Sequence, residues 1–355
     1  MSVLIIELGG SHMENVYTIV HLFYLKKQPV YFIANESLNN LIKEKEKISG
    51  IYLVPEKLNT AKEQLNVLRK IKSVVKEKNI NTIIFGTTEI KPVRNILLLL
   101  PNVNLIGILH DALKLDSSPT FKYIYSLRLH KYIVFGNFIR NNLKKYPKKN
   151  LYPFFPVYFP KPAHNPLIKN PEEIWIAVPG VVKSERKDYI PLLKKILETK
   201  LPENIKLVFL GKADRDESEI KSLIEKINSI KKAVVTFDDY LEYDTFHNYL
   251  AKTDFILPLL KINEDFFYGN TRISGAFNLA YSYQLPLLLP TSYKKNTDLI
   301  DYSLYYETTN ELYKLLQLIS EKKVESSQIR KAYEVKDQFN FEEMADELTS
   351  FIHQP

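Results

Sequence analysis

Short apolar runs alternate with amphipathic stretches along the first part of the chain. Residues 3–8 and 30–34 are rich in β-branched and aromatic side chains, which is typical of buried strands, and residues 18–26 place apolar residues at helical spacing. Residues 58–78 repeat apolar positions at intervals of three and four, which predicts an amphipathic helix. Further buried strands are predicted at residues 82–85, 105–109 and 132–135. Strands that are apolar on both faces and alternate with helices predict a parallel sheet covered on both sides.

Prolines interrupt this alternation between residues 146 and 171. They are Pro147, Pro153, Pro156, Pro160, Pro162, Pro166 and Pro171. Because proline is excluded from helix interiors and central strands, we expect a linker here. The alternation then resumes, with strands predicted at residues 174–178, 206–210, 234–237, 254–258 and 286–289 and helices at 189–199, 217–227, 243–251 and 274–283. A last amphipathic helix is predicted at residues 341–352.

The pattern predicts an α/β protein with two doubly wound, Rossmann-like parallel-sheet domains. The length of 355 residues fits two domains on the usual expectation of roughly 150 residues each. We place a first domain at residues 1–160, a second at residues 161–335 and a C-terminal helix at residues 336–355.

The composition is that of an ordinary globular protein, with 45% hydrophobic and 25% charged residues. The chain has no cysteine, which excludes disulfides, thiol nucleophiles and cysteine-ligated metals and fits a reducing cytoplasm. The first residues lack the basic lead-in of a signal peptide, and no apolar run approaches the roughly 18 residues of a membrane span. We therefore expect a cytoplasmic protein.

The charge is divided unevenly along the chain. Residues 1–160 contain 23 Lys and Arg against 11 Asp and Glu, whereas residues 161–355 contain 26 against 30. A basic half suits a nucleic acid, an anionic membrane surface or a phosphorylated substrate, and many of its lysines also lie on helix faces that solvent would cover. Because the basic half has no recognisable nucleic-acid readout motif, we expect no nucleic-acid partner and keep an anionic membrane surface as a partner.

Ligands of open parallel sheets bind beyond the carboxyl ends of the strands, so the loops there carry the candidate chemistry. The loop at residues 179–188 places Gly180, Lys183 and Arg186 together, and two cations beside a glycine suit a diphosphate. The loop at residues 268–276 offers hydroxyl and N–H groups at a helix N-terminus, which favours an anion, from Thr271, Arg272, Ser274 and Gly275. The structural alternatives are a solvated loop in the first case and a helix cap at Ser274 in the second.

Three further loops contain candidate site residues. Tyr240 lies between a strand and a helix, where an aromatic ring can contact a nucleobase. His110 and Asp111 end one predicted strand, and His12 follows the glycines after the first, so both histidines are expected on the same side of the first domain. The acidic residues of Asp214-Arg-Asp216 match a metal-binding D-x-D pattern, but they run directly into a helix and are explained by capping, so we expect no metal.

Taken in order, these pieces resemble the GT-B glycosyltransferases, in particular the retaining family 4 and its relatives in capsule and exopolysaccharide assembly. The resemblance spans nearly the whole chain. It rests on the glycine loop at residues 9–14, His110, Gly180 with its basic pair, the run at residues 235–258 and the helix of small residues before Pro286. The family usually carries two glutamates in the last loop and helix, where this chain aligns Thr271 and Leu279. The retaining or inverting outcome therefore stays open.

The resemblance implies two domains facing a central cleft and a metal-independent transferase. The donor would be a nucleoside diphosphate sugar and the acceptor a glycan or lipid-linked glycan. Lys183, Arg186 and the helix at Ser274 would hold the diphosphate, and His110 and His12 would position or deprotonate the acceptor. Two alternatives remain: a sugar-nucleotide epimerase of the same fold, and a catalytically inactive relative that acts as a binding subunit in polysaccharide assembly.

Overall fold

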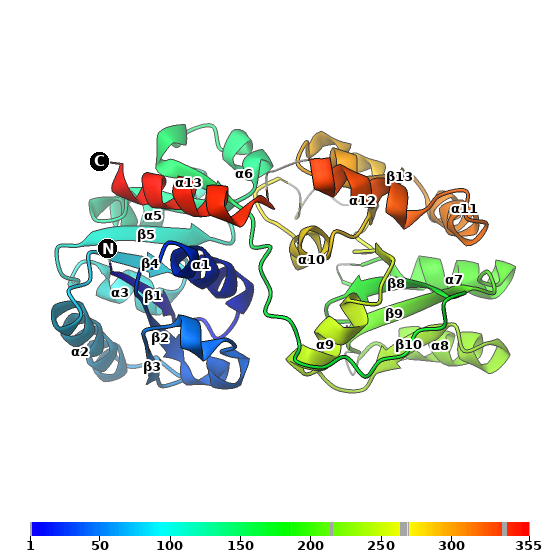
Figure 1. The fold of residues 1–355 in the computed structure, drawn as a ribbon, viewed down its shortest axis with the longest axis horizontal. Helices are drawn as coiled ribbons and strands as arrows, with labels where there is room; N and C mark the ends of the chain where they lie inside the picture. The colour runs from blue at the N-terminus through cyan, green and yellow to red at the C-terminus, as the bar shows by residue number, and fades with distance from the viewer. Residues whose placement is uncertain are drawn as a thin grey trace. The chain divides into compact units, whose positions relative to one another are not determined.

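The computed structural model describes residues 2–185, 187–213, 216–262, 268, 270–335 and 339–354. Its contacts divide the chain into two compact units (Figure 1). Unit 1 comprises Met1–Pro160, Asn270–Ile273 and Gln338–Pro355, and unit 2 comprises Lys161–Gly269 and Ser274–Asp337. Each unit is built around a parallel sheet, so the predicted fold class of two parallel-sheet domains is confirmed.

The sheet of unit 1 has seven parallel strands in the order β3-β2-β1-β4-β5-β6-β7. The strands are β1 (Val3–Glu7), β2 (Val30–Asn35), β3 (Gly50–Val54), β4 (Thr82–Phe85), β5 (Asn104–Leu109), β6 (Lys131–Phe135) and β7 (Leu151–Phe154). Every residue of β1, β4 and β6 is buried, as expected of strands covered on both faces. The order reverses direction between β1 and β4.

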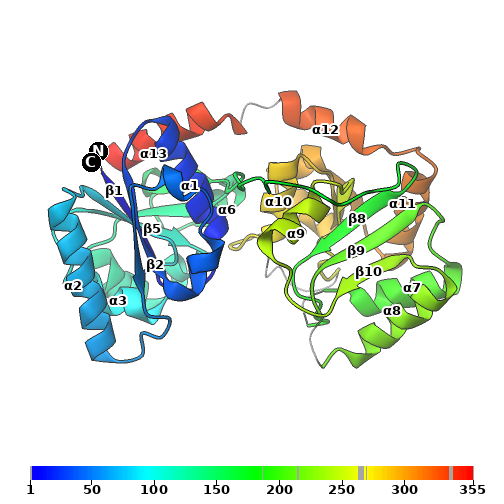
Figure 2. The same ribbon diagram turned by 60° about the horizontal axis from the view of Figure 1, so that its bottom comes forward.

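Helices and short turns surround this sheet (Figure 2). The helices are α1 (Met13–Leu25), α2 (Ala61–Glu77), α3 (Lys91–Leu97), α4 (Leu113–Ser117), α5 (Pro119–Tyr123), α6 (Asn137–Asn142) and α13 (Phe341–His353). The longest, α2, begins with a capping box in which Thr60 and Glu63 satisfy each other's backbone N–H groups. The 3₁₀ turns are η1 (Glu36–Leu41), η2 (Lys45–Lys47), η3 (Tyr125–Leu127) and η4 (Lys148–Asn150).

Helix α13 closes unit 1 and lies beside α1 in both views (Figures 1 and 2). Lys26 of α1 pairs with Glu342 and Asp346 of α13 at 3.1 and 2.8 Å. The amine of Lys131 in β6 donates to the carbonyl oxygens of residues 351 and 352 at 3.0 and 3.1 Å, which satisfies carbonyls at the helix C-terminus.

The sheet of unit 2 has six parallel strands in the order β10-β9-β8-β11-β12-β13, and it reverses direction between β8 and β11. The strands are β8 (Ile174–Pro179), β9 (Ile205–Lys212), β10 (Val234–Phe237), β11 (Phe255–Ile256), β12 (Leu287–Pro290) and β13 (Ser303–Tyr306). The helices are α7 (Tyr189–Thr199), α8 (Ser218–Ile230), α9 (Tyr243–Leu250), α10 (Gly275–Tyr283), α11 (Thr309–Ser320) and α12 (Ser326–Val335), with 3₁₀ turns η5 (Thr291–Lys295) and η6 (Ile300–Tyr302).

One sequence-based expectation is wrong. The stretch from residue 146 to residue 171 is not linker throughout, because residues 151–154 form strand β7 and Pro153 lies inside it. β7 is the last strand of its sheet, so a proline there removes no hydrogen bond that a further strand would need.

Candidate functional site

Each sheet has one place where the strand order reverses, and in open parallel sheets ligands bind beyond the carboxyl ends of the strands at such a place. In unit 1 it lies between β1 and β4, followed by the loops that begin at Leu8 and Gly86. In unit 2 it lies between β8 and β11, followed by the loops that begin at Gly180 and Leu257. These loops contain most of the residues that the sequence analysis selected.

A buried carboxylate joins the two loops of unit 1. Glu7, the last residue of β1, accepts a hydrogen bond from the backbone N–H of Gly9 at 2.5 Å and from Oγ1 of Thr87 at 2.9 Å. A Cβ atom at Gly86 would overlap this carboxylate, so any other residue there would force the Glu7 side chain to move. Burial raises the pKa of Glu7 to about 7, against the opposing effect of these hydrogen bonds. The site therefore contains a carboxyl group that exchanges protons near neutral pH.

The two predicted histidines stack on one another above these loops. The ring centroids of His12 and His110 are 3.8 Å apart, with 30° between the ring planes. His12 reaches this position through a left-handed backbone conformation with φ of 69°, directly before α1. A non-glycine residue in this conformation is uncommon and marks a backbone that its surroundings hold in place. The expectation that both histidines lie on the same side of the first domain is met in this geometry.

The His12 ring is held by a carboxylate. Its Nδ1 lies 3.0 Å from Oε1 of Glu14 in the first turn of α1. Burial opposes protonation of His12, but the hydrogen bond and negative charge of Glu14 outweigh it, so the pKa of His12 is raised. Burial likewise opposes ionisation of Glu14, and the same contact with His12 lowers its pKa. The contact thus favours the protonated form of His12 and the ionised form of Glu14.

The His110 ring is held in the opposite state. Its Nε2 lies 2.9 Å from the carbonyl oxygen of Gly86, and because a carbonyl only accepts, Nε2 carries the proton. Burial and the charge of His12 lower the pKa of His110. A neutral ring with its proton on Nε2 leaves Nδ1 as a proton acceptor. His110 is therefore suited to act as a base.

Sequence reasoning missed Glu89, which shapes the turn that presents His110. Its Oε1 accepts hydrogen bonds from the backbone N–H groups of His110 and Asp111 at 2.7 and 2.8 Å. Its Oε2 is buried, and no group among the described residues donates a hydrogen bond to it. A single glutamate four residues after β4 gives no pattern from which this contact could be predicted.

Asp111, the third predicted catalytic residue, forms an ion pair with Arg272 at 2.5 Å. The backbone N–H of Ala112 donates to the carbonyl oxygen of Thr271 at 3.1 Å, and Nδ2 of Asn142 donates to that of Asn270 at 3.0 Å. Thr271 and Arg272 thus belong to unit 1, whereas Ser274 and Gly275 belong to unit 2. The loop that the sequence analysis treated as one donor-binding element is divided between the two units.

Two glycines bring the ends of β8 and β9 together in unit 2. Gly180 has a φ of 95°, a conformation that favours glycine, and its N–H donates to the carbonyl oxygen of Leu210 at 3.0 Å. A Cβ atom at Gly211 would overlap the carbonyl group of Gly180. Because the two strand ends approach so closely at these glycines, backbone atoms line the start of the loop after β8.

The cations of this loop differ in their surroundings. Lys183 is exposed and pairs with Glu185 at 3.1 Å, and Arg186 lies outside the described residues. Lys187, which the sequence analysis did not select, is half-buried, and its amine donates to the carbonyl oxygen of Pro179 at 2.5 Å. Burial lowers the pKa of Lys187 to about 8. A partly desolvated cation at the carboxyl end of β8 is suited to an anionic ligand.

The loop after β8 is fixed to the loop after β11. The N–H of Asp188 donates to the carbonyl oxygen of Leu259, and Oδ2 of Asp188 accepts from the N–H of Ile262, both at 3.0 Å. Leu259 has a φ of 53°, which is a strained conformation for a bulky side chain. Strain of this kind persists only where the surrounding contacts enforce it, so these contacts hold Leu259 and the residues next to it in a defined conformation.

Two further predicted donor-binding elements lie in unit 2. Ser274 occupies the N-cap position of α10, but its side chain makes no capping hydrogen bond, so the capping alternative does not account for it. A Cβ atom at Gly275 would meet nothing within 4 Å. Tyr240 is 72% exposed after β10, and the amine of Lys212 lies 5.6 Å from its ring centroid and 2.7 Å from Oδ1 of Asp239. The ring is free to contact a planar ligand.

Metal binding and membrane crossing were both expected to be absent. Within these residues, no three His, Asp or Glu side chains gather in a group that could hold a metal ion, and Asp214 of the D-x-D pattern lies outside them. No helix in this part of the chain has the length and apolar character that a membrane crossing needs.

Comparisons with known proteins identify the fold. No protein-family model matches the chain, and no curated protein matches its sequence. Among solved structures, HepE (Alr3699) of Anabaena in complex with UDP and glucose is 12% identical, with 99% of each chain covered and a TM-score of 0.67. A glycosyltransferase from Rickettsia africae is 14% identical, covering 99% of this chain and 97% of its own, with a TM-score of 0.66. A putative UDP-N-acetylglucosamine 2-epimerase from Listeria monocytogenes is 13% identical, covering 100% and 97%, with a TM-score of 0.64.

The chain has the GT-B fold. The resemblance inferred from the sequence is thereby confirmed at the level of fold, over nearly the whole chain. In this GT-B chain, the two positions that the sequence analysis aligned with the family's glutamates carry Thr271 and Leu279 instead. Thr271 contributes a backbone oxygen to unit 1, and Leu279 is buried in α10. No carboxylate is present at either position to contact a donor sugar.

Proposed function

We propose that this protein is a glycosyltransferase that takes a sugar from a nucleoside diphosphate donor and transfers it to a glycan or a lipid-linked glycan in the synthesis of a surface polysaccharide. The observation that carries the proposal is the stacked pair of His12 and His110 at the carboxyl ends of a GT-B sheet, with Glu14 beside one ring. The solved structures with UDP and with UDP-glucose, both of HepE, support a nucleotide-sugar donor.

The donor half of the proposal lies in unit 2. Gly180 lets the backbone approach the diphosphate, and Lys183, Arg186 and Lys187 supply positive charge beside it. Cations placed there stabilise the nucleoside diphosphate as it leaves with the electron pair of the broken bond. Ser274 and Gly275 would contribute hydroxyl and N–H groups at the start of α10. The exposed ring of Tyr240 would contact the nucleobase.

The acceptor half lies in unit 1. His110 is neutral with an accepting Nδ1, so it would take the proton of the acceptor hydroxyl as the new glycosidic bond forms. The hydrogen-bonded pair of His12 and Glu14 would hold the His110 ring in place and orient the acceptor. Asp111, paired with Arg272, would keep residues 270–273 against the turn that carries His110.

We propose that donor binding needs no divalent metal, since lysine and arginine side chains can supply the positive field. EDTA should then leave the affinity for nucleoside diphosphate unchanged. Loss of binding in EDTA and recovery with Mg²⁺ or Mn²⁺ would contradict this and restore a role for Asp214 and Asp216.

A thermal-shift panel of nucleosides, nucleoside monophosphates and nucleoside diphosphates tests the proposed function. A ligand that binds only the folded state raises the unfolding temperature by mass action. At least one nucleoside diphosphate should raise it well above the shift given by its nucleoside. If no nucleotide shifts the transition, the donor half of the proposal fails.

A second candidate function is the epimerisation of a nucleotide sugar. The similarity to the putative epimerase from Listeria monocytogenes, with a TM-score of 0.64 over the whole chain, favours it. An epimerase would convert the donor with no acceptor present and release no nucleoside diphosphate. An NMR time course of donor alone with the purified protein separates the two functions.

A further inference from the structure

Glu89 lies in the short segment between β4 and α3 and binds the end of the neighbouring strand, β5. Its Oε1 accepts hydrogen bonds from the backbone N–H groups of His110 and Asp111, at 2.7 and 2.8 Å. These two residues directly follow β5, so one carboxylate oxygen holds the turn that carries the candidate base. Hydrogen bonds to a carboxylate are stronger than those between neutral groups, so this contact fixes the turn firmly.

The segment that carries Glu89 is itself held by other contacts. The N–H of Thr88 donates to the carbonyl oxygen of Ile108 in β5 at 3.2 Å. The hydroxyl of Tyr125, whose side chain is buried, donates to the carbonyl oxygen of Thr88 at 2.7 Å. Because the residue before Glu89 is bonded on both sides, the fold places this carboxylate independently of the turn that it binds.

The charge of Glu89 acts on both histidine rings. Its Oε2 is buried, and no group among the described residues donates a hydrogen bond to it. Burial lowers the pKa of His110, the charge of His12 lowers it further, and the charge of Glu89 raises it. Burial also opposes a high pKa at His12, whereas the contact with Glu14 and the charge of Glu89 raise it. Glu89 thus favours a proton on either ring.

Other charged groups lie at the two rings. They are Glu7 and Glu14 on the side of β1 and α1, and Asp111 with its partner Arg272 after β5. Glu14 contacts the ring of His12, and Asp111 is bound by Arg272. Glu89 differs from both because its hydrogen bonds go to the backbone that carries His110. It is therefore placed to act on His110 by geometry and by charge together.

We propose that Glu89 is a positioning residue of the transferase, which fixes the turn of His110 through two hydrogen bonds and stabilises the proton that this ring receives. As the acceptor oxygen forms the glycosidic bond, its proton passes to Nδ1 of His110, and the nucleoside diphosphate leaves with the electron pair of the broken bond. His110 then becomes positively charged beside His12, and the negative charge of Glu89 offsets part of that cost. The inference rests on the proposed function, because it requires His110 to accept this proton.

An NMR titration of the histidine rings tests the charge of Glu89 without requiring activity. The chain has seven histidines, and the signals of His110 and His12 are those that disappear in His110→Asn and in His12→Asn. Glu89→Gln removes the charge but keeps an oxygen that can accept the two N–H groups. The titrations of both rings should therefore move to lower pH in this variant. Unchanged titrations would overturn the proposal.

The pH profile of sugar transfer tests the positioning. In Glu89→Gln the acid limb of the kcat profile should move to lower pH, and most of kcat should remain at the new optimum. Glu89→Ala frees both N–H groups, so kcat should fall about 10²-fold at every pH, the cost of misplacing a reacting group by about 1 Å. The KM for the donor should stay unchanged in both variants, because the proposed donor site lies in unit 2. Equal losses of kcat in Glu89→Gln and Glu89→Ala, with an unshifted profile, would show a merely structural role and overturn the proposal.

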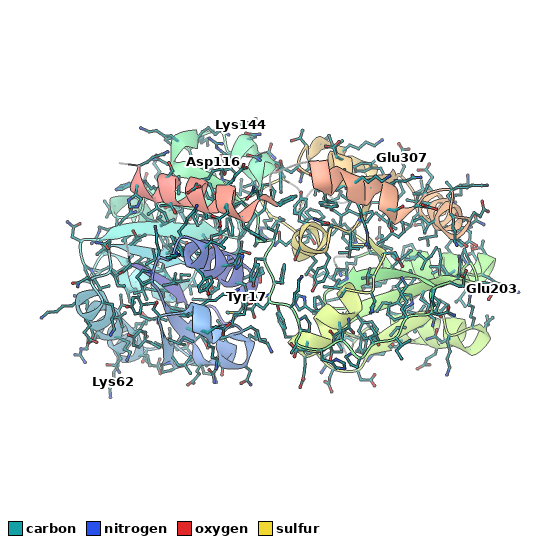
Figure 3. All side chains as sticks on the ribbon, viewed as in Figure 1. Tyr17, Lys62, Asp116, Lys144, Glu203 and Glu307 are labelled. Carbon is teal, nitrogen blue, oxygen red and sulfur yellow. The ribbon has the colours of Figure 1, made fainter. Side chains whose placement is uncertain are left out.

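Asp116 provides a matched control in the same unit. It is half-buried, its Oδ2 accepts a hydrogen bond from the backbone N–H of Lys144 at 3.3 Å, and its Oδ1 is buried with no donor among the described residues. Asp116 and Lys144 lie close together in Figure 3. Asp116→Asn should leave both titrations and kcat unchanged, and a shift as large as that of Glu89→Gln would overturn the proposal as a general effect of charge.

The two measurements also separate this inference from the proposed function. If the wild type transfers no sugar and no nucleoside diphosphate raises its unfolding temperature, the proposed function fails. The histidine titrations of Glu89→Gln still decide whether Glu89 acts on the two rings. If Glu89→Ala does not fold, as urea denaturation would show, Glu89→Gln and its shifted pH profile carry the test.

Discussion

Replacing Lys187 by methionine separates a binding role from a structural role. If the lysine is present to bind a diphosphate, it carries an unfavourable desolvated charge in the free protein. If it is present to hold the loop after β8, its removal should simply destabilise the fold. The two roles therefore predict changes of different sign in the free energy of unfolding.

The magnitude follows from the surroundings of the amine. Burial lowers the pKa of Lys187 from 10.5 to about 8, which corresponds to about 3 kcal/mol against the folded state at neutral pH. Methionine removes that cost but leaves the carbonyl oxygen of Pro179 without this donor, which costs about 1–3 kcal/mol. The variant should therefore be between unchanged and about 2 kcal/mol more stable.

The pH dependence has a defined sign. Between about pH 8 and pH 10.5 the unfolded state holds more protons on Lys187 than the folded state does, so the wild type gains stability as the pH rises. The variant lacks this contribution. The unfolding free energy that Lys187→Met gains over the wild type should therefore be largest below about pH 8 and should shrink steadily above it.

Urea denaturation and calorimetry measure the two effects. Lys187→Met should weaken nucleoside diphosphate binding about 10- to 150-fold, the value of a charged hydrogen bond to phosphate, and leave nucleoside binding unchanged. As a control, Lys194→Met on the exposed face of α7 should change stability by less than about 0.5 kcal/mol and leave binding unchanged. A clear loss of stability in Lys187→Met, with nucleoside and nucleoside diphosphate affected equally, would refute the reasoning.

Three further predictions concern the site and its scaffold. His110→Asn should lower sugar transfer by about 10²- to 10⁴-fold and leave donor affinity in calorimetry unchanged; an equal loss of donor affinity would instead show a structural role. Glu14→Gln should lower the pKa of His12 in an NMR titration, because Glu14 is the group that raises it, and an unchanged pKa would contradict this assignment. Gly211→Ala should lose more than about 2 kcal/mol of unfolding free energy in urea denaturation, because its Cβ would overlap the backbone of Gly180. The Cβ of Gly275→Ala faces open space, so the stability of this variant should be unchanged or slightly higher. Equal effects of the two substitutions would contradict the packing argument.

The fold was largely predictable because its central strands are buried on both faces. β1, β4 and β6 are buried at every residue, and each contains a continuous apolar run in the sequence, at residues 3–6, 83–85 and 132–135. Three of the four edge strands were not predicted: β3 and β13 are mostly half-exposed, and β7 contains Pro153. An edge strand needs neither a continuous apolar run nor a complete set of backbone donors, so its sequence signal is weak.

The candidate site was predictable where it depends on strand ends and not where it depends on packing. His12 and His110 each follow a buried strand, and parallel strands end at the same edge, so their proximity could be expected. The importance of Lys187 arises from burial around its amine, which no spacing reveals. The division of the loop after Asn270 between two units depends on contacts such as the ion pair of Arg272 with Asp111, far apart in the sequence.

The most direct test of the central claim is to follow nucleotide sugars by ³¹P and ¹H NMR with the purified protein, first alone and then with a lipid extract as a source of acceptor. The account predicts that one nucleotide sugar loses its sugar and releases free nucleoside diphosphate, and that the lipid extract makes this release faster. The release should also occur with EDTA present, and it should be absent with the His110→Asn variant. Conversion of the donor to an epimer without release of nucleoside diphosphate, or no change in any donor, would contradict it.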